Sequence, residues 1–109
     1  MTINFKHNPM NVTVQFVNLD RSPYVEELLM KKLKKIFKRY DWILKANVFY
    51  KLEKGSVGKG KICEIRLSVP GPRIFAFSDE ESFEMATDET IKDIERLLKK
   101  RKGEMKPHM

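Results

Sequence analysis

Apolar and polar residues alternate in four short segments of the chain, and a period of two is typical of a half-buried strand. In the first segment Val12, Val14 and Phe16 alternate with Thr13 and Gln15. A Pro-Gly-Pro turn before the last segment makes an antiparallel hairpin its simplest connection. The four predicted strands cover residues 12–18, 48–52, 63–69 and 74–77.

Two longer segments have apolar residues spaced three and four apart, as one face of an α-helix requires. In the first segment Ser22 can cap the helix, Pro23 suits its first position, and the apolar stripe continues to about Tyr40. The second helix begins near Ser82, and Gly103 and Pro107 mark where we expect it to stop. The predicted order of elements is therefore β-α-β-β-β-α.

This order predicts an α+β fold with a four-stranded mixed sheet and two helices packed on one face. The first strand-helix-strand crossover should be right-handed and should set its two strands parallel. Each helix has a single apolar stripe, so its polar face should look into solvent. With 109 residues the chain has the size of one domain, spanning 1–109, with an ordered core over about 12–102 and short tails.

The charge distribution adds a candidate function. The chain has 22 Lys and Arg against 15 Asp and Glu, a net charge of +7, and its cations are concentrated in residues 20–45 and 89–109. Like charges on neighbouring helix faces repel, and RNA phosphates would neutralise them, although a merely solvated face is the alternative. Opposite or beside the apolar stripes lie Lys31, Lys34, Lys35 and Lys38 in the first helix and Lys92, Arg96, Lys99 and Lys100 in the second.

Residues for catalysis or metal binding do not occur at a useful spacing. His7 and His108 lie near opposite ends, and Cys63 lies in a strand. The segment Gly55–Ile62 is similar to a P-loop, but Ile62 replaces the Ser or Thr that binds Mg²⁺, and a strand follows where a helix is required. We therefore expect that the protein is not an enzyme and that it binds no cofactor, metal or small-molecule substrate.

Two further groups have structural explanations that outweigh functional ones. The acidic run from Asp79 to Asp88 suits the start of a helix, where the dipole favours negative charge. Four aromatic residues have side chains able to stack on bases, namely Tyr24, Trp42, Phe75 and Phe77. We expect core or rim packing for these aromatic residues, with Trp42 as the most favoured exception.

The sequence also indicates a cellular compartment. No apolar run approaches the roughly 20 residues that span a bilayer, and the N-terminus does not resemble a signal peptide. The single cysteine, Cys63, cannot form an internal disulfide, which agrees with a reducing compartment. We expect a cytoplasmic protein that has no membrane partner and is a monomer when free.

Several residues form patterns of a known family. These are Leu33, Lys35, Ile36, Lys38 and Asp41 at the end of the first helix, Phe83 and Asp88 at the start of the second, and the basic ending of residues 96–102, RLLKKRK. Over about residues 12–106 the chain thereby resembles the ribosome hibernation promoting factors and ribosome-associated inhibitor A, formerly described as sigma-54 modulation proteins. With seven residues after Lys102, it is most similar to the short form.

The resemblance implies a protein that binds ribosomal RNA of the small ribosomal subunit in the channel for messenger and transfer RNA. Translation would thereby be inhibited during stress or stationary phase. Leu97 stands where relatives often have Gln, which removes one polar RNA contact. The phosphate-contacting positions of the family correspond to Lys35, Lys38, Arg96, Lys100 and Lys102. A general double-stranded RNA-binding module and an interaction module for an acidic protein remain as alternatives.

Overall fold

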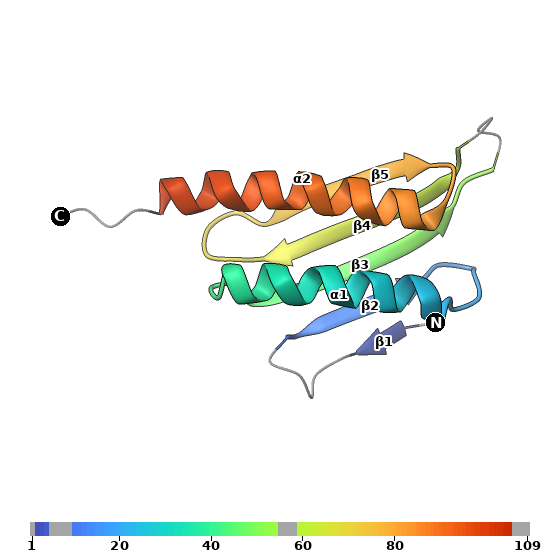
Figure 1. Cartoon of the computed structure of the whole chain (residues 1–109), viewed down its shortest axis with the longest axis horizontal. Helices are drawn as coiled ribbons and strands as arrows, with labels where there is room; N and C mark the ends of the chain where they lie inside the picture. The colour runs from blue at the N-terminus through green and yellow to red at the C-terminus, as the bar shows by residue number, and fades with distance from the viewer. Residues whose placement is uncertain (1, 5–9, 55–58, 106–109) are drawn as a thin grey trace.

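A mixed β-sheet with two α-helices on one face forms the protein (Figure 1). The computed structural model describes residues 2–4, 10–54 and 59–105. His7, His108 and the first half of the P-loop-like segment, residues 55–58, therefore lie outside the described residues. The elements are β1 (Thr2–Asn4), β2 (Val12–Phe16), α1 (Pro23–Arg39), β3 (Lys45–Leu52), β4 (Lys61–Ser68), β5 (Ile74–Glu80) and α2 (Phe83–Glu104).

The sheet has the strand order β1-β2-β3-β4-β5, and only β2 and β3 are parallel neighbours. From β2 onward this is the predicted β-α-β-β-β-α fold, so the four-stranded mixed sheet and the two helices on one face are confirmed. Strand β1 adds an edge that the sequence did not predict, pairing Ile3 with Val14. A segment of three residues, TIN, is too short to show a period.

Both helices begin where their capping residues predict. The Ser22 hydroxyl accepts a hydrogen bond of 3.4 Å from the amide of Val25, and the Ser82 hydroxyl accepts one of 3.1 Å from the amide of Met85. The prediction that α2 stops between Gly103 and Pro107 is confirmed, since the helix ends at Glu104. Gly103 is helical and exposed there, and the hydrogen bonds that close this last turn offset its low helix propensity.

The core lies between the helices and the inner face of the sheet, where alternate strand residues are buried. The ring of Tyr50 on β3 stacks on Phe16 of β2, and its hydroxyl lies 2.8 Å from that of Thr87 on α2. Because Thr87 donates its own proton to the Phe83 carbonyl, Tyr50 is the donor to Thr87. Buried hydrogen bonds thus fix the position of α2 on the sheet.

The two helices run in the same direction side by side, so their C-terminal ends lie at one end of the molecule (Figure 1). Ion pairs join them, with Lys32 Nζ 2.9 Å from Asp88 Oδ1 and Arg39 Nη1 3.9 Å from Glu95 Oε2. The helix layer therefore presents the outer faces of both helices together. Among the described residues, no helix is sufficiently long and apolar to cross a membrane.

Candidate nucleic-acid interface

The basic residues that the sequence singles out all have exposed side chains. Seven of them have no ion-pair partner among the described residues: Lys31, Lys34, Lys35, Lys38, Lys99, Lys100 and Lys102. We call these seven the unpaired lysines. Their charges are not offset by neighbouring carboxylates, so they attract anions more strongly than paired cations would.

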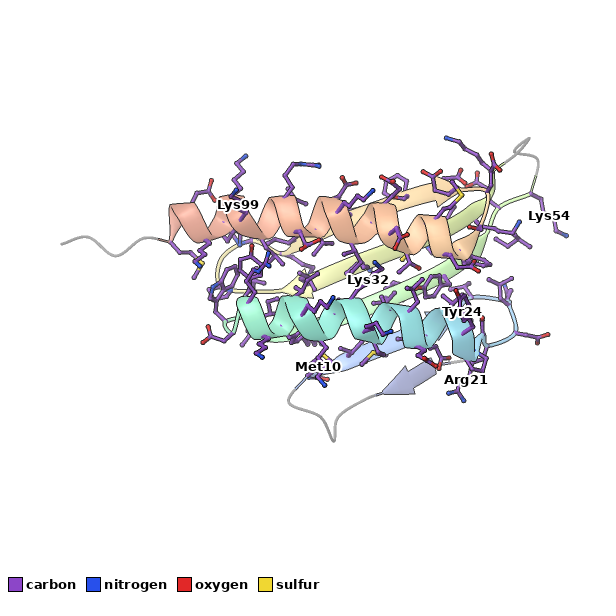
Figure 2. All side chains as sticks on the ribbon, viewed as in Figure 1. Met10, Arg21, Tyr24, Lys32, Lys54 and Lys99 are labelled. Atoms are coloured by element: carbon purple, nitrogen blue, oxygen red, sulfur yellow. The ribbon has the colours of Figure 1, made fainter. Side chains whose placement is uncertain are left out.

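On α1 the unpaired lysines face solvent because the opposite stripe is committed to the core. Leu29, Leu33 and Ile36 are buried against the sheet, and a helix turns by about 100° per residue. Lys32 lies between the two faces and toward α2, where it pairs with Asp88 (Figure 2). The lysines of α1 thus divide into four that face solvent and one that joins the helices.

On α2 two of the expected cations are paired with carboxylates of their own helix. Lys92 Nζ lies 3.4 Å from Glu89 Oε1, and Arg96 Nη1 lies 2.9 Å from Asp93 Oδ1. About 70% of each cationic side chain is exposed, at 69% for Lys92 and 71% for Arg96. Exposed pairs of this kind contribute little stability, so both cations can exchange their partner for a phosphate.

The basic residues of the two helices come close together where both helices end. Lys102 Nζ on α2 lies 5.9 Å from the ring centroid of Tyr40, the residue that caps α1. Lys99 lies on the C-terminal half of α2, at the opposite end of the helix layer from Tyr24 (Figure 2). The partial negative charge of the two helix C-termini offsets part of the repulsion among these cations. The result is a basic surface on one end of the helix layer.

Arg101 lies within the family-like stretch of residues 96–102 but has a structural contact. Its Nη1 donates a hydrogen bond of 2.9 Å to the carbonyl of Pro70, and only 17% of its side chain is exposed. It therefore ties α2 to the turn between β4 and β5. Gly71 in this turn has a φ of +87°, a conformation that favours glycine.

The acidic run belongs to two elements, which corrects the expectation that it starts the second helix. Asp79 and Glu80 end β5, whereas Glu84 lies in the first turn of α2. Asp79 Oδ1 accepts a hydrogen bond of 2.6 Å from the amide of Gly60, and Asp88 pairs with Lys32. Within the described part of the chain, no group of three His, Cys, Asp or Glu residues is suited to a metal ion.

The aromatic residues differ from the expectation of core or rim packing. Phe75, Phe77 and Tyr24 are 46%, 56% and 65% exposed. Trp42, the favoured exception, instead packs partly buried against the core, with its ring 5.7 Å from that of Tyr40. The sequence missed these exposures because two phenylalanines in one strand follow the same period as core residues. The sheet register shows that they lie on its outer face.

Burial also explains why the single cysteine is not a reactive group. Cys63 is buried beside Tyr50 and Thr90, and burial raises the pKa of its thiol to about 12. Its carbonyl accepts a hydrogen bond of 3.0 Å from the Thr90 hydroxyl. The protonated thiol is a weak nucleophile, and Cys63 serves here as a core residue.

Comparison with known proteins assigns the fold. The family described as Sigma 54 modulation protein / S30EA ribosomal protein matches residues 12–106. A ribosomal subunit interface protein from Coxiella burnetii has 25% sequence identity and a TM-score of 0.74, covering 84% of this chain and 97% of its own. The Protein Y N-terminal domain from Thermus thermophilus has 22% identity and a TM-score of 0.65, covering 80% of this chain and 92% of its own. At this identity the similarity supports only the fold. No curated protein matches the chain.

Proposed function

The chain belongs to the Sigma 54 modulation protein / S30EA ribosomal protein family, a family of ribosome-associated proteins, and from this membership we propose that it is a ribosome hibernation factor. Its proposed partner is the small ribosomal subunit, where it contacts ribosomal RNA in the channel for messenger and transfer RNA. It acts in the cytoplasm and inhibits translation during stress or stationary phase.

The unpaired lysines are the observation that supports this proposal most directly. They lie on two parallel helices whose C-terminal ends meet, so one face presents several cations to a single polyanion. Bringing phosphates to these lysines releases counterions from the RNA, which favours binding at low salt. Most of the affinity is therefore electrostatic and comes from contacts to the RNA phosphate backbone, which do not by themselves distinguish one base sequence from another.

Inhibition follows from occupancy of the channel and needs no chemical step. A folded domain that occupies the channel excludes messenger and transfer RNA by volume and by competition for phosphates. Both helices are packed on the sheet and joined by ion pairs, so the protein loses little conformational freedom on binding. The proposed role is that of a stoichiometric, reversible inhibitor without catalytic activity, cofactor or small-molecule substrate.

Sedimentation of the full chain with small subunits tests this function, with isolated duplex RNA and an acidic protein as competitors. The expected result is one bound protein per small subunit, displaced by initiation complexes but only weakly by duplex RNA. Equal affinity for duplex RNA and for ribosomes would indicate a general double-stranded RNA-binding module instead. Failure to bind either RNA, together with capture by the acidic protein, would indicate an interaction module.

A further inference from the structure

The face of the sheet opposite the helices carries an aromatic patch that the helix-based function does not use. Antiparallel strands with one solvated face usually place polar residues outward. Here Phe75 and Phe77 on β5 point outward with 46% and 56% exposure, and Phe49, half-buried on β3, lies on the same face across β4 from them. The centroids of the Phe75 and Phe77 rings lie 6.0 Å apart, and the rings are tilted by 41°. Exposed apolar groups of this kind mark interaction sites.

Cations accompany the aromatic rings. The guanidinium carbon of Arg66 on β4 lies 4.9 Å from the ring centroid of Phe49 and 5.9 Å from that of Phe75. Glu64, which is 7% exposed, binds Arg66 at 2.7 Å and Lys51 at 2.9 Å. These two cations and one carboxylate together carry a net charge of +1. The buried carboxylate also holds the guanidinium in place among the rings.

A pocket of about 410 Å³ connects this patch to the basic end of α2. It lies at the free edge of β5, and its lining includes Arg73, Phe75, Leu97 and Lys100. Arg73 and Lys100 have no ion-pair partner among the described residues. A chain of phosphates on the helix surface can therefore continue past Lys100 and Arg73 to Phe75 at the edge of the aromatic patch.

We propose that the outer face of the sheet binds single-stranded RNA, with phosphates held at the β5 edge by Arg73 and Lys100 and bases stacked on Phe75 and Phe77. Aromatic rings beside a positively charged groove are the combination by which proteins bind unpaired nucleotides without a strong sequence preference. The guanidinium plane of Arg66 offers a further surface for a base. This surface shares Lys100 with the helix face but otherwise lies on the opposite side of the sheet, and it goes beyond the proposed ribosomal function.

The chemistry of the patch favours RNA over a protein surface. An apolar protein partner would cover Arg66 and Lys51 and leave their charges in a poorly solvated environment. A single strand instead brings bases to the rings and phosphates to the cations. Duplex RNA is less suitable, because its bases are stacked on one another and do not present their faces to side chains.

Binding of a fluorescently labelled, unstructured RNA of ten nucleotides to the full chain tests the proposal, with Kd measured by anisotropy at fixed salt. The double substitution Phe75→Ala, Phe77→Ala should raise Kd at least about tenfold, because removing one base–aromatic stack alone costs roughly 5- to 150-fold. The double variant Phe75→Tyr, Phe77→Tyr retains both rings and should bind nearly as the wild type does. Tyr24→Ala is the matched control, since Tyr24 is an exposed aromatic residue of the helix layer.

An unchanged Kd in the folded double-alanine variant would overturn the proposal, as would an equal loss in Tyr24→Ala. If the wild type forms a dimer that this variant abolishes, with no effect on RNA, the patch joins two copies and the proposal is wrong. Ribosome sedimentation of a Lys35→Ala, Lys38→Ala variant separates the two surfaces. Loss of ribosome binding there, with single-strand binding retained, supports both; retention of ribosome binding contradicts only the function of the helices.

Discussion

Lys32 Nζ lies 2.9 Å from Asp88 Oδ1 across the contact between α1 and α2. Lys35, one turn further along α1, is exposed and has no ion-pair partner among the described residues. Two lysines of one helix therefore differ in their surroundings: one joins the helix layer, and the other is available to a partner. The variants Lys32→Ala and Lys35→Ala each remove one positive charge, so together they provide a matched comparison for the proposed interface.

Replacing Lys35, Lys38, Lys100 and Lys102 together with Ala should weaken association with small subunits and reduce its dependence on salt. Each lost phosphate contact should lower the slope of log K against log salt concentration by roughly 0.7 to 0.9, because fewer counterions are released. Affinity measured between low and physiological salt checks the slope. The single variant Lys32→Ala should leave it unchanged, and a folded quadruple variant with wild-type affinity would contradict the proposed interface.

Arg101→Ala should destabilise the fold even though Arg101 lies in the basic stretch. The change removes the hydrogen bond from Nη1 to the Pro70 carbonyl, which holds the turn between β4 and β5 against α2. A loss of about 1–2 kcal/mol in the free energy of unfolding is expected for a charged donor at a partly buried site. Urea denaturation measures it, and Lys99→Ala, which removes an exposed and unpaired cation, should change stability by less than about 0.5 kcal/mol.

Alkaline pH should destabilise the protein through Cys63. Burial raises the pKa of the folded thiol from 9.0 to about 12, so the unfolded chain loses this proton first. Below pH 9 the contribution of Cys63 is fully present, and as pH rises toward 12 it falls by about 1.4 kcal/mol per pH unit. Denaturation at pH 8 to 10 should therefore bring wild type and Cys63→Ala closer in stability. A constant difference between them would show that the thiol pKa is not raised.

Local patterns were sufficient to predict most of the fold. Strands with one buried face show a period of two, and the caps Ser22 and Ser82 determine where the helices begin. These signals lie within a few residues of each other in the sequence. Strand β1 was missed because a short edge strand depends on its pairing with β2, a contact between segments about ten residues apart.

The candidate site was less predictable because it depends on contacts between elements. Periodicity places Lys35 on the outer face of a helix, but it does not indicate that Lys92 pairs with Glu89 or that Lys32 pairs with Asp88. In the same way, alternation in β5 does not show which side of the sheet carries Phe75. Only the register with β4, which aligns it with Arg66, makes that clear.

Translation in a cell-free system should be inhibited stoichiometrically. A protein that acts by occupying a channel inhibits one ribosome per bound molecule, so the block should saturate near one protein per ribosome and require no added nucleotide or metal. Because electrostatic contacts dominate, raising salt or adding initiation complexes should displace the protein and restore activity. Complete inhibition at a small fraction of the ribosome concentration would instead require turnover. Ribosomes that stay inactive after the protein is washed away would likewise indicate chemical modification, and either result would contradict the occupancy mechanism.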